Sequence, residues 1–142
     1  MDDLNKTHTM LDAFYKLYSI DIFDEFSKLL KGEAQILNYI LSSNSAEVTP
    51  SLLSEKLCVT KARITSAISS LKRKEYILTE VSKNDKRKII IKITQKGKFF
   101  IDSKFKKVES GFESIIKKLG DGNSDEIIRI INLLSSTYST QT

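Results

Sequence analysis

Cationic and hydroxyl side chains are concentrated in two short stretches near the middle of this sequence. Residues 60–73 are rich in Ser, Thr, Lys and Arg, and residues 83–88 carry four cations around Asp85. Lys and Arg bind phosphate oxygens, while Ser, Thr and Arg also form hydrogen bonds to the edges of bases. The chemistry that these residue types predict is the binding of a polyanion.

The positive charge of the chain is concentrated around the same two stretches. Residues 55–98, called the basic segment here, contain 13 Lys and Arg against 4 Asp and Glu, a net charge of +9, whereas the whole chain carries +5. The other residues hold 10 basic and 14 acidic side chains and are therefore negative. Clustered charge is typical of nucleic-acid binding, whereas a modest overall excess indicates little.

A helix, a turn and a second helix are predicted to position the first stretch. Thr49 is a natural N-cap, and Pro50 fits the first helical position, where its missing N–H costs nothing. Residues 58–60 are predicted to form a turn, and Thr60 can cap a helix over residues 61–75. In that helix Ile64, Ala67, Ile68 and Leu71 fall within one arc at about 100° per residue, so they are expected to face the core.

The outer side of this second helix is small and hydroxylated. It is predicted to carry Ala62, Thr65, Ser66, Ser69 and Arg73, flanked by Lys61 and Arg63. A face without long acidic side chains can enter a DNA major groove, where Arg reads guanine and a Thr methyl group meets thymine. The alternative is an ordinary solvent-facing surface that happens to be poor in long side chains.

After Tyr76 the hydrophobic period changes from 3.6 to 2, which predicts a β-hairpin. The strands are expected over residues 77–82 and 88–94, with Ile89, Ile91 and Ile93 on one face. Residues 83–87 join them. The cations at the tip and shoulders can reach a minor groove, where narrow A·T tracts attract Arg; they are Lys83, Lys86, Arg87 and Lys88. The alternative is a charged hairpin that only protects an exposed sheet edge.

Helices are predicted on both sides of the basic segment. Residues 8–31 are expected to form an amphipathic helix, bent near Ile20–Asp21 and ended by Gly32, and residues 33–42 a second helix. A long helix from Thr94 carries a heptad-like seam that suits packing along another helix; its members are Ile101, Phe105, Val108, Phe112, Ile115 and Leu119. Gly120 and Gly122 stop it, and Ser124 is expected to cap a last helix that is apolar on more than one side.

These motifs together resemble the MarR family of bacterial transcriptional regulators. The resemblance rests on the two short helices, on Asp85-Lys86-Arg87 in the wing, and on Ile93-Thr94-Gln95-Lys96-Gly97 before the long helix. The exit from the second helix, Glu75-Tyr76-Ile77, lacks the Gly that the family usually has there. The predicted fold is mainly α with a small β-hairpin (α+β): a winged helix-turn-helix flanked by N- and C-terminal dimerisation helices.

The resemblance implies a homodimer on double-stranded DNA. It places residues 61–73 in the major groove and Arg87, oriented by Asp85, in the minor groove. Thr60 is expected to bind DNA together with the residues of this helix and of the wing named above. Residues 1–142 would form one chain of this type, with the winged helix-turn-helix in 33–98 and the dimerisation helices in 8–31 and 95–139. Family members often respond to phenolic ligands, oxidants or metals, so a small-molecule effector stays open.

The expected function is therefore a sequence-specific DNA-binding regulator on a pseudo-palindromic operator, with repression favoured over activation. The alternative is a winged-helix dimer that serves mainly in protein–protein assembly. An enzyme is not expected, because the sequence has no Gly-rich phosphate loop and no His near Cys58 to act as a base. Cys58 is expected to be a small buried hydrophobic residue. No cofactor, no metal and no membrane partner are expected, and the compartment predicted is the cytoplasm.

Two further sets of residues are candidate sensors of an effector. His8 and Cys58 are far apart in sequence, which makes a zinc site unfavourable. Tyr15, Tyr18, Phe26 and Tyr39 are aromatic candidates for a pocket between the dimerisation helices and the winged helix. Because aromatic residues at helical spacing usually belong to a core, no ligand-binding residue is assigned.

Overall fold

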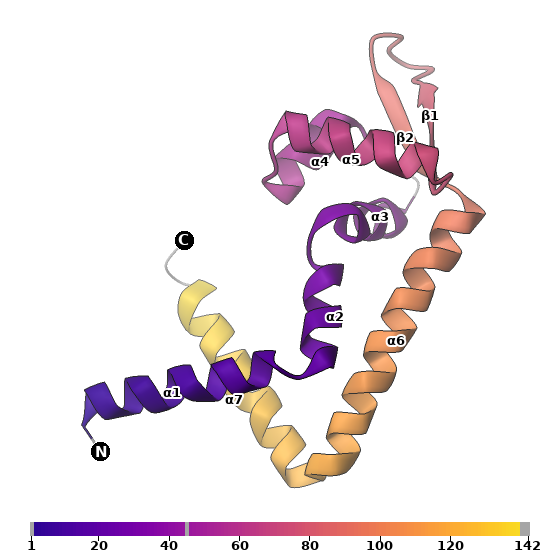
Figure 1. The fold of residues 1–142 in the computed structure, drawn as a ribbon. Helices are drawn as coiled ribbons and strands as arrows, with labels where there is room; N and C mark the ends of the chain where they lie inside the picture. The colour runs from indigo at the N-terminus through magenta and orange to yellow at the C-terminus, as the bar shows by residue number, and fades with distance from the viewer. Residues whose placement is uncertain (1, 45, 140–142) are drawn as a thin grey trace. The chain divides into compact units, whose positions relative to one another are not determined.

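The computed structural model describes residues 2–44 and 46–139, which form seven helices and a two-stranded antiparallel sheet (Figure 1). The predicted fold class, mainly α with a small β-hairpin, is confirmed. The described part of the chain contains no helix that is long and apolar enough to cross a membrane. The elements in chain order are α1 (Asp3–Tyr18), α2 (Asp21–Leu29), α3 (Gly32–Ser42), α4 (Pro50–Leu57), α5 (Lys61–Arg73), β1 (Ile77–Val81), β2 (Ile89–Ile93), α6 (Gln95–Leu119) and α7 (Asp121–Ser139).

The chain divides into two compact units. The first ends at Lys106 and contains α1 to α5, the hairpin and the beginning of α6. The second begins at Lys107 and contains the rest of α6 and α7.

The N-terminal region is two helices, so the prediction of one bent helix over residues 8–31 is wrong. α1 ends at Tyr18, and the Ser19 hydroxyl donates a hydrogen bond to a carbonyl of its last turn at 2.6 Å. Ile20 then adopts an extended conformation before α2 begins. Gly32 does not end this region as predicted, because with a φ of 64° it is the first residue of α3.

The core of the first unit lies where α3, α4, α5 and the hairpin meet. α3 contacts both α5 and β2, and α4 packs against α5. The side chains of Leu37, Leu53, Ile64, Leu71 and Ile91 are at most 2% exposed. These residues come from four different elements, so one small apolar cluster fixes the helix-turn-helix and the base of the hairpin together.

The hairpin pairs Ile77 with Ile93 at its base and Val81 with Ile89 near its tip. Its strands are one residue shorter at several ends than predicted. Ile77 and Ile91 are buried, whereas Val81 and Ile89 are 61% and 50% exposed. On its other edge β2 meets the connection before α4, where the Ile91 N–H donates to the carbonyl of Val48 at 2.8 Å. The base of the hairpin is therefore anchored on two sides and its tip projects.

α7 begins at Asp121, four residues earlier than a helix capped by Ser124 would begin, so Ser124 is not its N-cap. Gly120 adopts a left-handed conformation with a φ of 78°, which reverses the chain immediately after α6. Ser124 lies one turn inside α7, and its hydroxyl donates to the carbonyl of Gly120 at 2.8 Å. The sequence pattern favoured a longer loop because Gly122 looked like part of the turn, but Gly120 alone provides the conformation that the reversal requires.

Large apolar side chains remain uncovered on the first and last helices. α1 has no buried residue among those that the structure describes. On α7 the only buried residue is Ser124. The exposed apolar residues on α1 are Leu4, Met10, Leu11, Phe14, Tyr15, Leu17 and Tyr18. Those on α7 are Ile127, Ile128, Ile130, Ile131, Leu133, Leu134 and Tyr138. Exposed apolar side chains in this number on one helix are typical of an interface.

Candidate nucleic-acid interface

The helix-turn-helix forms where the sequence predicted it. The Thr49 hydroxyl accepts the Leu52 N–H at 3.1 Å, which caps α4, and Pro50 is the first helical residue. The Thr60 hydroxyl accepts the Arg63 N–H at 3.3 Å and caps α5. Thr60 thus has a structural role at the start of the helix that was predicted to bind DNA.

The turn between the helices contains Cys58 in a left-handed conformation, with a φ of 52°. Its thiol is free and exposed, so the prediction of a buried residue is wrong. Cys58 is the C-cap of α4 and lies outside the helix, so it does not belong to the apolar face that α4 buries. Within the described ranges, no group of three His, Cys, Asp or Glu side chains could hold a metal ion.

α5 buries one face and exposes the other, as its periodicity predicted. Ile64 and Leu71 are 1% and 0% exposed. The predicted outer residues are all exposed; they are Lys61, Ala62, Arg63, Thr65, Ser66, Ser69 and Arg73. The Thr65 hydroxyl donates to the carbonyl of Lys61 at 2.9 Å. Its hydroxyl proton is therefore used within the helix, and its oxygen lone pair and methyl group remain for an external partner.

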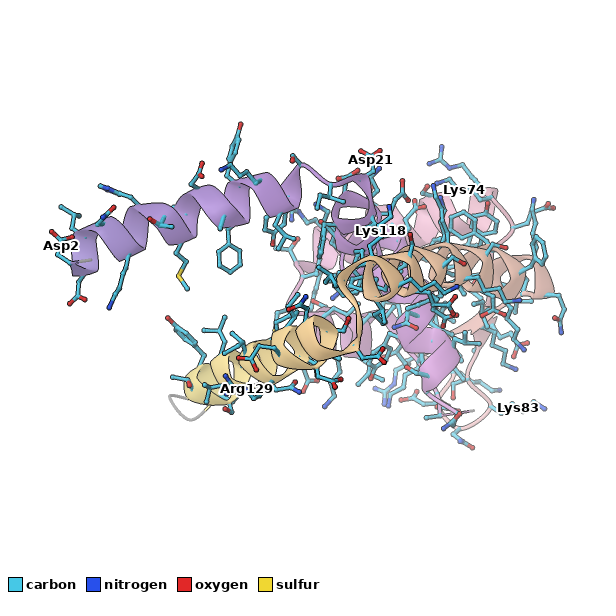
Figure 2. The ribbon with its side chains drawn as sticks, turned by 90° about the horizontal axis from the view of Figure 1, so that it is seen from below. Asp2, Asp21, Lys74, Lys83, Lys118 and Arg129 are labelled. Atoms are coloured by element: carbon cyan, nitrogen blue, oxygen red, sulfur yellow. The ribbon has the colours of Figure 1, made fainter. Side chains whose placement is uncertain are left out.

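The C-terminal end of α5 is attached to α3 by an ion pair between Lys74 and Glu33, whose Nζ and Oε2 atoms lie 2.7 Å apart. Figure 2 labels Lys74 at the end of this helix. Partial burial acts to raise the pKa of Glu33, but the hydrogen bonds from Lys74 and Ser70 and the charges of Lys74 and Arg73 outweigh it and lower that pKa below its ordinary value of 4.5. The pair fixes the exit of the helix relative to α3.

The wing is defined here as β1, β2 and the loop of residues 82–88 between them. Its Arg87 side chain is 92% exposed. Asp85 Oδ1 accepts hydrogen bonds from the Arg87 backbone N–H at 3.0 Å and from Nε at 3.4 Å. The aspartate therefore holds both the backbone and the guanidinium of Arg87, as the MarR resemblance implied for this pair.

The other cations of the wing loop are exposed; they are Lys83, Lys86 and Lys88. Figure 2 labels Lys83 at the start of the loop, where its side chain extends outward. All the candidate residues predicted from the sequence are thus present on two exposed surfaces of the first unit, except that Asp85 is half-buried. Whether those surfaces contact DNA stays a prediction.

The loop also contains a buried residue, Ser82, that the sequence motifs did not identify as a site residue. Ser82 is only 2% exposed, and its hydroxyl donates to Glu47 Oε1 at 3.4 Å. Ser82 Oγ in turn accepts the N–H groups of Asn84 at 3.2 Å and Asp85 at 3.3 Å. A Ser placed two and three residues before these N–H groups is a known turn pattern, so a signal was present in the sequence.

The Thr94-to-Gly97 motif is a structural link. The Thr94 hydroxyl donates to the carbonyl of Glu75 at 2.6 Å and accepts the Gly97 N–H at 3.0 Å. A Cβ atom on Gly97 would lie 2.2 Å from the carbonyl oxygen of Tyr76. The motif therefore joins the exit of α5 to the start of α6 through contacts that only Gly allows.

The exit from α5, Glu75-Tyr76-Ile77, makes its turn without the Gly that the MarR family usually has there. Glu75 itself adopts a left-handed conformation, with a φ of 62°. The backbone reversal that a Gly would provide is thus present, but a residue with a Cβ atom makes it at some cost. Tyr76 then stacks on Phe100 of α6, with ring centroids 4.5 Å apart.

Comparison with known proteins identifies similar sequences. Residues 33–111 match the family described as winged helix DNA-binding domain. The chain is 30% identical over 105 residues to the HTH-type transcriptional repressor YetL of Bacillus subtilis, an alignment that covers 66% of this chain. It spans 63% of the length of that relative.

Solved structures share the fold along nearly the whole chain. YusO from Bacillus subtilis has a TM-score of 0.75 at 14% identity and covers 94% of both chains. Streptococcus pneumoniae FabT, solved in complex with DNA, has a TM-score of 0.66 at 20% identity, covering 99% of this chain and 100% of its own. At these identities the likeness concerns the arrangement of helices and wing.

Proposed function

The chain belongs to the winged helix DNA-binding domain family, and from that premise we propose that it is a transcriptional regulator that binds a pseudo-palindromic DNA duplex as a homodimer and represses transcription. The fold that the MarR resemblance implied is confirmed. The observation that carries the proposal is that one compact unit presents both the small, hydroxylated face of α5 and the exposed guanidinium of Arg87.

The face of α5 suits a major groove. A B-DNA major groove is about 12 Å wide and admits one α-helix. Ala62, Thr65, Ser66 and Ser69 are exposed and have short side chains, so the helix backbone can approach the base edges closely. Lys61 and Arg63 at the N-terminus and Arg73 near the C-terminus supply charge for the flanking phosphates.

The wing suits an adjacent minor groove. Arg87 lies at the end of a hairpin whose base is fixed in the core, and Asp85 limits the orientations of its guanidinium. A narrow A·T minor groove has an enhanced negative potential that attracts Arg. Lys83, Lys86 and Lys88 add charge along the same loop, so binding is expected to weaken steeply as the salt concentration rises.

The dimer is supported by the uncovered apolar surface of α1 and α7. Their exposed leucine, isoleucine and aromatic side chains would lose unfavourable contact with water if a second copy covered them. Two copies related by a two-fold axis would read half-sites about one helical turn apart. A small-molecule effector would regulate the protein only if it bound one spacing of the two winged helices better than another.

The decisive test is selection of bound duplexes from a random pool by the full chain at two salt concentrations. We expect a consensus with two inverted half-sites and an affinity that falls as salt increases. A basic-segment variant with Lys61, Arg63, Lys86 and Arg87 changed to Glu is the matched control and should select nothing. If the wild-type chain enriches no sequence, or if the control binds as well, the proposal is wrong and assembly with proteins becomes the better hypothesis.

Whether binding represses or activates requires a second measurement. A reporter gene placed downstream of the selected duplex should be transcribed less when the chain is present. An increase in transcription would retain DNA binding but contradict repression.

A further inference from the structure

Resting on the proposed function, we infer that Ser82 is a positioning residue for DNA binding, which sets the place of Arg87 from the buried start of the wing loop. Ser82 does not contact a ligand itself, because its side chain is 2% exposed. Its hydroxyl lies between the connection that precedes α4 and the loop that carries Arg87. It therefore joins the helix-turn-helix to the tip of the wing.

All the hydrogen-bonding capacity of this hydroxyl is used. It has one donor and two lone pairs. The donor meets Glu47 Oε1 at 3.4 Å, and the oxygen accepts the N–H groups of Asn84 and Asp85 at 3.2 and 3.3 Å. The Ser82 backbone N–H in turn donates to the carbonyl of Lys88 at 2.9 Å, across the loop. The loop is thus fixed at both of its ends through one residue.

The position of Arg87 follows from these contacts in two steps. Ser82 holds the backbone of Asp85 through its N–H, and Asp85 Oδ1 holds the backbone N–H and Nε of Arg87. The Asp85 carbonyl also accepts the Lys88 N–H at 2.9 Å, which closes the turn. Since the Arg87 side chain is otherwise 92% exposed, the hydrogen bonds to Asp85 are the restraints that the described structure gives it.

Glu47 connects this loop to the DNA-reading helices. The next residue, Val48, is 1% exposed, and its carbonyl accepts the N–H of Ile91 in β2. Thr49, one residue later, caps α4. A shift at Ser82 would therefore change the place of the wing relative to the helix-turn-helix, while the apolar core that folds the unit would stay intact.

The inference predicts a specific coupling between Ser82 and Arg87. On a duplex selected by the wild-type chain, Ser82→Ala should weaken binding about fivefold, the size of one lost hydrogen bond of about 1 kcal/mol. In an Arg87→Ala background the same change should cost less than about twofold, because the group that Ser82 positions is absent. In an Arg63→Ala background the full loss should remain, since Arg63 lies on α5.

Two variants serve as controls. Ser103→Ala removes a hydroxyl that is exposed on α6 and bonded only to the Phe99 carbonyl at 2.7 Å, and it should leave affinity unchanged. Ser82→Thr retains the hydroxyl and should restore at least half of the lost affinity. Thermal unfolding of each variant shows whether the fold is kept. If Ser82→Ala does not fold, the same cycle is run with Glu47→Ala, which changes an exposed side chain.

The outcomes separate this inference from the proposed function. If the wild-type chain selects no duplex, the proposed function fails first. If it binds its duplex but Ser82→Ala binds equally well, or loses the same factor with and without Arg87, Ser82 does not position Arg87. If Ser103→Ala weakens DNA binding by the same factor as Ser82→Ala, Ser82 does not position Arg87 either.

Discussion

At the scale of single residues, the backbone conformation and close contacts at positions 75 and 97 determine which residue types fit there more than side-chain chemistry does. Gly97 faces the Tyr76 carbonyl so closely that a Cβ atom would lie 2.2 Å from its oxygen. Glu75, two residues before the hairpin, carries a left-handed backbone that would suit Gly better. Position 97 thus has the Gly that its close contact requires, whereas position 75 has a Glu whose backbone conformation is strained.

The strain at Glu75 predicts that Glu75→Gly stabilises the protein by about 1 kcal/mol, because a Cβ atom in the left-handed region costs roughly that amount. The free energy of unfolding, measured by urea denaturation, checks it. Glu75→Ala is the matched control, since it removes the exposed ion pair with Lys96 but keeps the Cβ atom. Equal stabilities of the Gly and Ala variants would contradict the prediction.

Gly97→Ala should destabilise the protein by at least about 2 kcal/mol, since the added methyl group would force the backbone of Tyr76 or the side chain of Ile93 to move. The same denaturation measurement applies. Gly122→Ala is a suitable control, because nothing lies within 4 Å of its added Cβ. The prediction fails if the two alanine variants unfold at the same urea concentration.

Arg87→Ala should weaken binding to the selected duplex about tenfold, as expected for the loss of a charge-assisted contact of roughly 1.5 kcal/mol. It should leave the oligomeric state unchanged. Gel-shift titration and size-exclusion chromatography measure the two properties. Lys118→Ala, which removes a cation outside the basic segment, controls for the loss of one positive charge. A parallel loss of the oligomer would count against a direct role of Arg87 in binding.

At the scale of elements, α5 is attached to its neighbours by polar links at its end as well as by its apolar face. Thr94 bonds the exit of α5 to the start of α6. Glu33 and Lys74 bond α3 to the last residues of α5, and the carboxyl group is half-buried. The apolar face of α5, the helix that is proposed to read DNA, holds it against the core, and the polar links at its end restrain its orientation.

The Glu33–Lys74 link predicts a pH-dependent contribution to stability. Because the pKa of Glu33 is lowered below 4.5 in the folded chain, its contribution is fully present above that pH and is lost as the pH falls through the folded pKa. Glu33→Gln should therefore cost about 0.5 kcal/mol at pH 7, as for other partly exposed pairs, and less at pH 3. Urea denaturation at both pH values measures the difference. A cost that is independent of pH would contradict the prediction.

At the scale of the whole molecule, each of the two units carries a helix with large exposed apolar side chains, α1 in the first and α7 in the second. On α7, Ile127, Ile130, Ile131 and Leu134 follow helical spacing, and each is at least 45% exposed. The second unit begins at Lys107 and contains little besides the end of α6 and this helix. Such a pair of helices is expected to need a partner, and a second copy is the one that the proposed function requires.

Ile131→Asp should convert the proposed dimer to a monomer, because it places a charge in the middle of this apolar stripe. DNA affinity should fall at least about tenfold, since one half-site would be read alone. Light scattering after size-exclusion chromatography gives the mass. Asn132→Asp adds the same charge at the neighbouring exposed position and should remain dimeric. A wild-type chain that is itself monomeric at micromolar concentration would overturn the proposed dimer.

The sequence by itself determined the identity and the exposed faces of the central elements. Thr49 and Thr60 each cap a helix by accepting the N–H of the residue three positions later. The apolar stripe from Ile64 to Leu71 repeats every three or four residues. These signals are local, because hydrogen bonding and periodicity act over one helical turn. The outer face of α5 and the wing cations could therefore be predicted from the residues alone.

Only the tertiary structure decided the features that depend on contacts between distant residues. The burial of Ser82 against Glu47 joins residues 35 positions apart, and the close approach at Gly97 involves Tyr76, which belongs to another element. The early start of α7 and the exposure of Cys58 depended on which residue adopts a left-handed backbone. Composition and spacing do not determine these contacts and turn positions, because they depend on how neighbouring elements pack and on which residue adopts the strained left-handed conformation.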